Sequence, residues 1–243
     1  MITHPQAAAA PVPDPDEERR RIQTARLLAY RDDGPLVALL RGKMGPGLPP
    51  VPAGLASLLA VIAIGVTGVL GDGVAPANGP IMLLPVLVMV ALMVPTAPRD
   101  HLGRFDWLAP PLIRGTEFLT IIFLGLAAGT PKWLLFVLIY VVGYHTYDTV
   151  YRTRQSIWPA PWVFQAGLGW EVRLLLLGAG AALGVLTWVV AVMSVYLGVL
   201  FAIESIKSWV GLDKETALAQ AGDDLEASPE DAMEQATGEA EKA

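Results

Sequence analysis

Long apolar runs separated by short polar segments fill the chain between residues 51 and 211. Six such runs stand out, at residues 54–70, 80–94, 108–128, 133–151, 172–184 and 187–209. A helix that crosses a bilayer needs about 20 mainly apolar residues, and the longer runs reach that length. The pattern predicts an all-α fold, a polytopic membrane helix bundle of about six transmembrane helices. Several runs are short, so one of them could instead form a re-entrant segment.

Polar segments precede this predicted transmembrane domain. Residues 1–13 are rich in alanine and proline and lack a basic stretch leading into an apolar run, so we expect a disordered N-terminus and no signal peptide. Residues 14–50 predict two basic amphipathic cytosolic helices, the first capped by Asp14 and ended by the Asp-Asp-Gly-Pro of residues 32–35. Such helices can lie on an anionic leaflet or pack against the protein's own cytosolic face. The pattern alone does not separate the two.

The segment at residues 212–243 has a different composition from the rest of the chain. It holds ten acidic and two basic residues, a net of −8 against −6 for the whole chain, which leaves +2 for the remainder. Few large apolar residues and many carboxylates are typical of an acidic disordered tail. The alternative is an acidic segment that docks on a partner.

Basic residues are distributed unequally between the two sides that six spans would create. The loops on one side hold only Lys132, whereas nearly all other Lys and Arg residues outside the runs fall on the side of the N-terminus. Cytosolic loops carry the excess of Lys and Arg. The distribution therefore predicts cytosolic N- and C-termini in a multi-pass protein of the cell membrane.

Composition narrows the classes of function. Hydrophobic residues make up 53% of the chain and charged residues 16%, and the mean hydropathy is +0.49. The chain has no cysteine, which excludes disulfides, thiolate metal sites and a cysteine nucleophile. It also lacks a phosphate-binding glycine loop, HExxH, GxSxG and the basic and aromatic surface of a nucleic-acid reader. We expect membrane lipids and no nucleic acid as partners, and the sequence assigns no reaction.

Charged and polar residues interrupt the last four apolar runs toward their cytosolic ends. Between Trp107 and Leu212 there are only four acidic residues, one in or beside each run, and basic residues accompany them. The candidate polar cluster consists of Arg114, Glu117, His145, Tyr147, Asp148, Tyr151, Arg152, Arg154, Glu171, Arg173 and Glu204. Ionisable groups at membrane depth are costly and are functional candidates by default.

One interpretation of this cluster is a cavity, open to the cytosol, that binds a phosphate or pyrophosphate group. Arginine suits this task because its planar guanidinium can make two parallel hydrogen bonds to a phosphate. Asp148, Glu171 and Glu204 could hold a Mg²⁺ ion as cofactor, or one carboxylate could act as a general base with His145 as shuttle.

The alternative interpretation of the cluster is structural. Arg114 and Glu117, like Asp148 and Arg152, lie one turn apart on one helix face, and cross-helix ion pairs would neutralise them. Glu171 and Arg173 are two residues apart, so they should face different partners. The aromatic residues would form an interfacial belt. Its members would be Tyr144, Tyr147, Tyr151, Trp158, Trp162 and Trp170.

Several motifs are similar to those of an uncharacterised bacterial membrane domain of unknown function. They are RDDGPLVALLRG, GRFDWLAPPLIRGTEFL, YHTYDTVYRTR, GWEVRLLLL and ESIKSW, and the similarity covers about residues 30–211. The domain resembled occurs alone or C-terminal to nucleotidyltransferase and CDP-alcohol phosphatidyltransferase domains. Where such domains tend to read GWDGR, this chain has Glu171 and Val172, so a ligand held by that carboxylate would sit differently.

The resemblance implies a role in envelope phospholipid or glycolipid biosynthesis in the bacterial inner membrane. The chain does not carry the signature of the CDP-alcohol phosphatidyltransferase itself, which has paired aspartates that form a two-metal centre. Asp148 is the only aspartate between Asp106 and Asp213. A CDP-alcohol phosphatidyltransferase or another envelope-biosynthesis enzyme is the implied partner.

Three functions remain as hypotheses from the sequence. We expect a membrane protein that binds a phosphorylated or lipid-linked head group from the cytosolic side, as an accessory to or part of envelope phospholipid or glycolipid biosynthesis. The first alternative is a structural or scaffolding membrane protein with no ligand. The second is a small transporter, in which Pro85 and the glycines of residues 172–184 could break helices.

Overall fold

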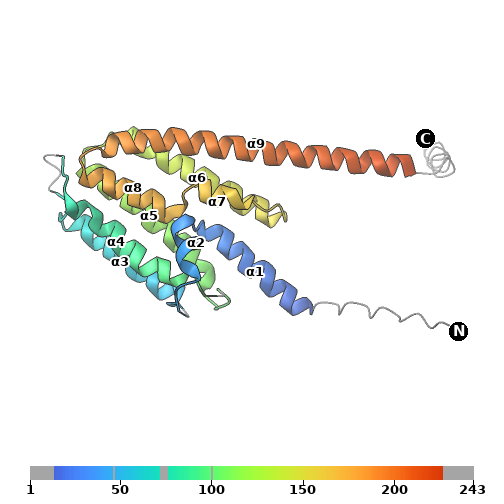
Figure 1. Ribbon diagram of the computed structural model, residues 1–243, viewed down its shortest axis with the longest axis horizontal. Coiled ribbons are helices and arrows are strands. Elements are labelled where there is room, and N and C mark those ends of the chain that lie inside the picture. Colours follow the sequence, from blue (N-terminus) through green and yellow to red (C-terminus); the bar gives the residue numbers. More distant parts are fainter. Residues whose placement is uncertain (1–13, 46, 72–75, 100, 227–243) are drawn as a thin grey trace, which may run out of the picture. The chain divides into compact units, whose positions relative to one another are not determined.

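The computed structural model describes residues 14–226 except residues 46, 72–75 and 100, and for residues 212–226 it describes the backbone alone. Every regular element in this part of the chain is a helix (Figure 1). The chain divides into two compact units, one ending at Gly198 and the other beginning at Val199. The site described below lies in the first unit.

The two basic helices expected ahead of the apolar runs are α1 (Pro15–Arg31) and α2 (Pro35–Arg41). The Asp14 side chain caps α1 by accepting a hydrogen bond from the Asp16 N–H at 3.0 Å. The first half of α1 is exposed, whereas its second half packs against α5 and α6. The helix α2 buries Val37 and packs against α8. Of the two expected positions for these helices, packing on the protein therefore holds for α2 and for the second half of α1.

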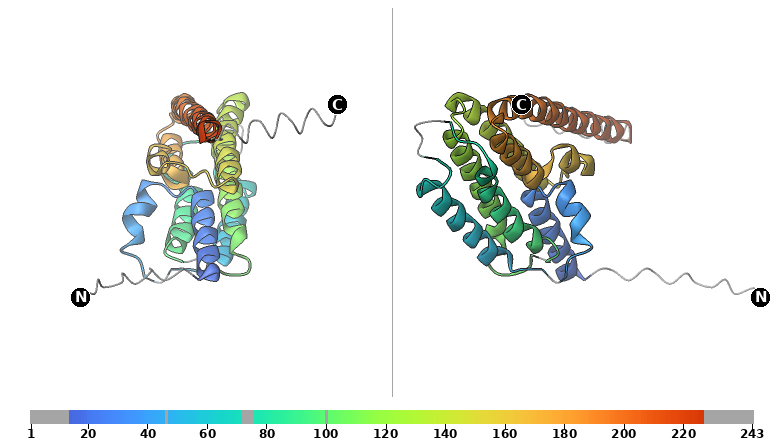
Figure 2. Two further views of the ribbon diagram at one scale, coloured as in Figure 1. Left: turned by 90° about the vertical axis from the view of Figure 1, so that its right-hand side faces the viewer. Right: turned by 60° about the vertical axis from the view of Figure 1, so that its left-hand side comes forward.

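A bundle of helices follows, in which α3, α4, α5, α6 and α8 pack on one another (Figures 1 and 2). The remaining helices are α3 (Pro50–Val66), α4 (Leu84–Met93) between the 3₁₀ turns Pro80–Leu83 and Val94–Thr96, α5 (Ala109–Ala127) after the 3₁₀ turn Asp106–Leu108, α6 (Lys132–Arg154), α7 (Pro161–Ala166), α8 (Gly169–Ala182) and α9 (Leu186–Glu226). The helix α5 lies at the centre of this bundle, since it contacts α1, α3, α4, α6 and α8.

Among the described residues, three helical segments are long and apolar enough to cross a membrane: Asp106–Ala127, Lys132–Arg154 and Leu186–Gly211. The apolar segments Pro50–Val66 and Pro80–Thr96 are shorter, and α8 has 14 residues. At 1.5 Å per residue, α8 is about 21 Å long, whereas a bilayer core is about 30 Å thick. The structure thus gives a helical protein with three helices of spanning length, and the other three expected spans are shorter helices.

Large apolar side chains face outward on these long helices. Trp133, Phe136 and Tyr140 are exposed along α6, and Trp188 and Val192 are exposed on the first part of α9. Soluble proteins rarely expose apolar surface over a whole helix face. These faces suit contact with lipid.

The last helix extends beyond the last apolar run of the sequence. The helix α9 continues to Glu226, so residues 212–226 are helical where the sequence predicts a disordered tail. Alanine, glutamate and leucine are frequent there, and they are strong helix formers even where no apolar face needs burial. Residues 1–13 and 227–243, the rest of the expected disordered ends, lie outside the described residues.

Candidate functional site

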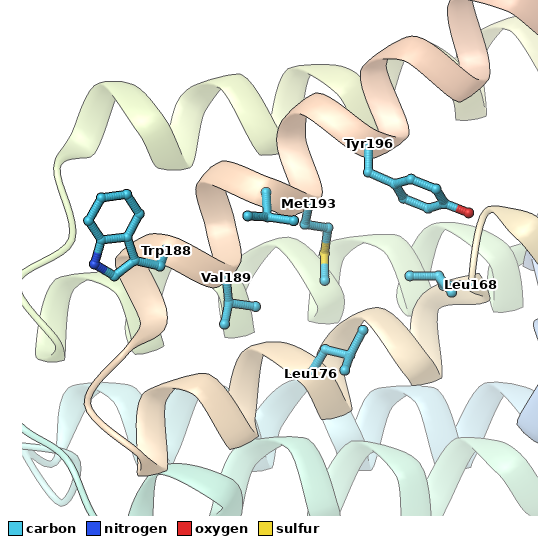
Figure 3. A pocket seen from close by; sticks show the side chains of 7 residues that line it. Leu168, Leu176, Trp188, Val189, Met193 and Tyr196 are labelled. Atoms are coloured by element: carbon cyan, nitrogen blue, oxygen red, sulfur yellow. The ribbon is translucent and has the colours of Figure 1, made fainter.

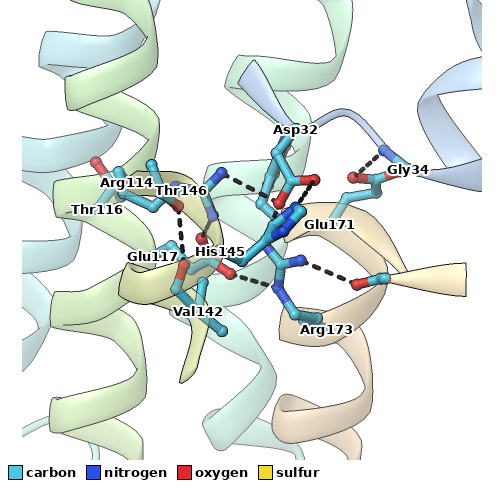
Figure 4. Close-up of polar contacts among 12 residues, drawn as sticks. Asp32, Gly34, Arg114, Thr116, Glu117, Val142, His145, Thr146, Glu171 and Arg173 are labelled. Atoms are coloured by element: carbon cyan, nitrogen blue, oxygen red, sulfur yellow. Dashed lines mark hydrogen bonds and ion pairs between the residues drawn. The ribbon is translucent and has the colours of Figure 1, made fainter. Parts of the chain in front are cut away.

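The turn that ends α1 places a buried carboxylate against the bundle. Asp32 occupies the C-cap position with φ 52° and ψ 46°, a left-handed conformation that aspartate adopts more readily than most residues. Its side chain reaches groups on α5, α6 and α8 (Figure 4). Asp32 therefore joins the segment before the apolar runs to three helices of the bundle.

Two arginines and two carboxylates form a closed network around Asp32. Arg173 donates from Nη2 to Asp32 Oδ2 at 2.8 Å and from Nε to Glu117 Oε1 at 2.8 Å. Arg114 donates from Nη2 to Asp32 Oδ2 at 3.2 Å and from Nη1 to Glu117. The four side chains are at most 9% exposed. We call Asp32, Arg114, Glu117 and Arg173 the Asp32 network, and its charges balance.

The surroundings of Asp32 favour its charged form. Burial alone would raise the pKa of this carboxyl, but Arg173, with His145 and Arg114, holds the pKa well below its usual range. His145 Nε2 lies 3.7 Å from Asp32 Oδ1. The carboxylate is therefore held in its ionised form near neutral pH.

The next residue, Asp33, gathers a second set of polar groups. Its Oδ2 accepts hydrogen bonds from Arg31 Nε and Arg41 Nη2, each at 2.9 Å, and its Oδ1 accepts one from Trp170 Nε1 at 3.0 Å. Arg31 also donates to the Thr96 hydroxyl at 2.9 Å. Burial would raise the pKa of the Asp33 carboxyl, but the two arginines and Trp170 lower it. Two guanidinium groups thus share one carboxylate.

Glu171 holds the start of α2. Its two oxygens accept hydrogen bonds from the backbone N–H groups of Gly34, at 3.1 Å, and Val37, at 3.2 Å. The backbones touch here, because a Cβ on Gly34 would lie 2.3 Å from the Leu168 carbonyl oxygen. Gly169 has φ +60°, and a Cβ there would lie 2.2 Å from the Gly34 nitrogen. The backbone at Gly34 therefore packs directly on the backbone at the start of the GWEVR segment, and the Glu171 carboxylate caps the first turn of α2.

Part of the candidate cluster expected from the sequence comes together. Arg114, Glu117, His145 and Arg173 surround Asp32, and Glu171 lies beside them on α8 (Figure 4). Glu171 and Arg173 face different partners, as expected from their spacing. Arg114 pairs with Glu117 one turn away. The expected contacts within helices are thus present, and Asp32 completes them.

The other members of the cluster belong to α6 and α9. Arg152 and Asp148 pair with each other on α6 at 2.9 Å. Tyr147 and Tyr151 are exposed on the same helix and stack at 6.1 Å, and Arg154 is exposed at its end. Glu204, in the second unit, accepts a hydrogen bond from the Ser208 hydroxyl at 3.1 Å.

The carboxylates suggested for magnesium come from α6 (Asp148), α8 (Glu171) and α9 (Glu204). Within the described ranges, no group of three or more His, Cys, Asp or Glu side chains is placed to hold a metal ion. Glu171 uses both oxygens on backbone N–H groups, and Asp148 pairs with Arg152. Both carboxylates are thus engaged in contacts within the protein.

Trp170 is not part of an interfacial belt. It is fully buried, and its indole N–H donates to Asp33, whereas Trp158, Trp162 and Tyr144 are about half exposed. A buried tryptophan needs a partner for its N–H, and Asp33 provides one. The belt expected from the sequence therefore loses this member.

Sequence reasoning missed Asp32 and Asp33 as site residues. Both follow an amphipathic helix and precede Gly34 and Pro35, and this pattern is fully explained as a helix-ending turn. The available signal for a site was the pair of consecutive carboxylates, because it precedes an apolar domain that contains arginines. Only the fold shows that the turn is inserted among those arginines.

An amphipathic groove lies beside the Asp33 group. It has a volume of about 390 Å³ and is formed by α1, α2 and residues 158–165. Leu28, Ala38, Trp158 and Phe164 give it apolar walls. Arg41 reaches it with a side chain that is 39% exposed. We call this space between α1, α2 and residues 158–165 the head-group groove.

Comparison with known proteins gives one family and no further match. The model of a family of unknown function (DUF5941) matches residues 22–225, which include the Asp32 network and the head-group groove. This confirms the resemblance to an uncharacterised domain and extends it at both ends. Neither a curated protein nor a solved structure matches the chain.

Proposed function

We propose that this chain, which belongs to a family of unknown function (DUF5941), is a multi-pass membrane protein. In this proposal it binds a phosphorylated or lipid-linked head group from the cytosolic side. The binding site in this proposal is the head-group groove between α1, α2 and α7. The observation that carries the proposal is the position of Arg41 in its wall.

Arg41 gives the groove an excess of positive charge. Arg31 and Arg41 both pair with Asp33, so one guanidinium charge is not balanced within that group. Arg31 is completely buried, whereas Arg41 is accessible from the groove. A guanidinium beside apolar walls suits a phosphate attached to an apolar group.

The proposed phosphate site differs from the one that the sequence suggests, which consists of the arginines of the polar cluster. Arg114 and Arg173 are enclosed and neutralised by Asp32 and Glu117. A phosphate would have to displace these carboxylates and open the contacts of α1 with α5. The head-group groove needs no such change.

The proposed topology places the groove at the cytosolic surface of the membrane. Six crossings, with the shorter α3, α4 and α8 among them, put both termini in the cytosol and keep nearly all basic loop residues there. Trp158 and Trp162 are half exposed next to the groove, which suits the interface between lipid and water.

The biological setting is a further part of the proposal and rests on the resemblance stated above. The domains that this chain resembles occur alone or C-terminal to nucleotidyltransferase and CDP-alcohol phosphatidyltransferase domains, and this resemblance implies action beside such an enzyme in the bacterial cell membrane. A phosphorylated head group is the chemical link between the groove and that setting.

A structural function is the second candidate, and the Asp32 network favours it. The network is balanced and enclosed, and it fastens α1 to α5 and α8. In that case the protein would act as a scaffold and the groove would stay without a specific ligand. The transport hypothesis stays a prediction.

Substitution of Arg41 tests the proposal. We expect Arg41→Ala to weaken binding of dioctanoyl phosphatidic acid about tenfold, because a hydrogen bond to a charged group contributes about 1.5–3 kcal/mol. Dioctanoylglycerol, which lacks the phosphate, should bind wild type and variant alike. Binding can be followed by native mass spectrometry of the detergent-solubilised protein.

Lys43→Ala is the matched control, because it removes the same charge two residues away and outside the groove. Equal loss in both variants would indicate general attraction of anions to a basic surface. An unchanged preference for phosphatidic acid in Arg41→Ala would contradict the proposed site and leave the scaffold function.

A further inference from the structure

A second groove runs between α8 and the first part of α9. It has a volume of about 380 Å³, and its wall is apolar, with Leu176 from α8 and Val189, Val192 and Met193 from α9 (Figure 3). Trp188 marks one end of the groove, and Leu168 and Tyr196 mark the other. We call it the acyl groove.

The two grooves are separated by a single turn of chain. Gln165 lines the head-group groove and Leu168 lines the acyl groove, and the Leu168 N–H donates to the Gln165 carbonyl at 3.1 Å. The Tyr196 hydroxyl donates to the Ala166 carbonyl at 2.8 Å, which fastens α9 to this turn. A ligand that passes over the turn would reach both grooves at once.

The grooves differ in polarity in the way that the two ends of a lipid differ. Asp33, Arg41 and Gln165 give the first groove its polar groups, and the Asp33 carboxylate there is already paired with Arg31 and Arg41. The wall of the second groove is formed by hydrocarbon and aromatic side chains and the Met193 thioether. The side chains of Leu176, Trp188 and Val192 are open to the surroundings, so a chain could enter sideways from the bilayer.

We propose that one phosphorylated lipid occupies both grooves, with its head group against Arg41 and one acyl chain between α8 and α9. This inference rests on the proposed function, because it assigns the rest of the same ligand. It narrows the ligand class from any phosphorylated head group to one carried by an acyl chain.

The direction of the acyl groove fits a lipid of the cytosolic leaflet. Leu168 lies just before the first residue of α8 and near the head-group groove. The acyl groove extends from Leu168 along α8. Tyr196 and Trp188 are eight residues apart on one helix, so the groove is about 12 Å long at 1.5 Å per residue. A lipid anchored at Arg41 would therefore point its chain toward the middle of the bilayer.

A photoreactive phosphatidic acid tests this inference. The probe carries a diazirine near the end of one acyl chain and is added to the full-length protein in phosphatidylcholine nanodiscs. We expect cross-links in the peptides that contain Leu176 and Val189–Met193, and we expect unlabelled phosphatidic acid, but not phosphatidylcholine, to compete with them.

Two leucine substitutions separate the acyl groove from the lipid-exposed surface in general. Leu176→Phe enlarges a side chain within the groove and should reduce these cross-links severalfold. Leu59→Phe makes the same change on an exposed position of α3, away from both grooves, and should leave them unchanged. Thermal unfolding of both variants checks that they fold like wild type.

The outcomes distinguish this inference from the proposed function. Cross-links spread over all lipid-exposed helices, without competition by phosphatidic acid, would overturn the acyl groove; if Arg41→Ala still lowers the binding of phosphatidic acid, the head-group proposal stands. Cross-links confined to the acyl groove but unaffected by Arg41→Ala would overturn the assignment of one lipid to both grooves. Loss of the cross-links in both Leu176→Phe and Arg41→Ala would support it.

Discussion

Asp32 shows how a single side chain can fasten a polar segment to a membrane domain. Its left-handed C-cap conformation turns the carboxylate toward Arg114 and Arg173, which come from helices far along the chain. A buried pair contributes little net stability when complete, but leaving one charge without a partner is costly. The network therefore matters most for what happens when one member is removed.

The spacing of residues predicted part of this network. Arg114 and Glu117 share a helix face, and the separation of Glu171 from Arg173 predicted different partners. Asp32 could not be placed, because turn formation already explained an aspartate before glycine and proline. Contacts across 141 residues depend on packing that no local pattern contains.

We expect Asp32→Asn to destabilise the folded protein by about 3–5 kcal/mol, because Arg114 and Arg173 would share a single carboxylate in a buried site. Asp16→Asn is the control, since it breaks an exposed pair with Arg19 whose contribution should be below about 1 kcal/mol. The measurement is chemical or thermal unfolding in detergent. A similar small effect in both variants would show that the network is not a stabilising device.

The pH dependence of stability should follow from the same residue. The pKa of Asp32 in the folded protein is lowered from its ordinary value of 3.8. The contribution of this carboxylate to the free energy of unfolding is therefore fully present above about pH 4, and it is lost as the pH falls from there toward the folded pKa. Unfolding midpoints measured from pH 3 to 7 should fall at the acidic end for wild type. Asp32→Asn should show a shallower fall.

At the scale of elements, the docking of α2 depends on two backbones that touch. Glu171 accepts from the first turn of α2, and Gly34 lies directly against Leu168 and Gly169. The sequence predicted both amphipathic helices and a break between them, because proline, glycine and aspartate give strong local signals. It did not predict that α2 would pack on α8, since a helical stripe shows which face is apolar but not what covers it.

Gly34→Ala should undock α2, because the added Cβ would overlap the Leu168 carbonyl group. We expect a loss of about 1–3 kcal/mol, typical of overpacking, together with faster trypsin cleavage after Arg31, which is completely buried in the folded protein. Gly42→Ala is the matched control, since nothing lies within 4 Å of a Cβ there. If trypsin cleaved both variants after Arg31 as slowly as wild type, the contact of Gly34 with Leu168 would not be what docks α2.

At the scale of the whole molecule, apolar runs predicted an all-helical membrane protein, and the helices found match the runs closely. Within the described residues, three of them reach spanning length, whereas α3, α4 and α8 are shorter than the about 20 residues of a typical span. Helix ends depend on caps, prolines and tertiary contacts, so hydropathy fixes the existence of a span better than its limits. The number of crossings therefore needs a direct measurement.

The absence of cysteine makes that measurement clean. A single cysteine at Lys132→Cys should react with a membrane-impermeant maleimide added to whole cells, because six crossings place residue 132 on the outer side. Arg154→Cys, at the other end of α6, should react only after the membrane is opened. The unsubstituted protein serves as a blank, and labelling of both sites from one side would refute the proposed crossing of α6.

The span of the Asp32 network also sets a time at which it can form. Asp32 leaves the ribosome 141 residues before Arg173, which is about 7–28 s at about 5–20 residues per second. During this interval Arg114 already has Glu117 on its own helix, so α5 can enter the membrane as a neutral pair. Only the late arrival of α8 supplies Arg173, Glu171 and the backbone that receives Gly34. The helices α1 and α2 are thus made early but fixed late, and a nascent chain that stops before α8 should expose them to proteases.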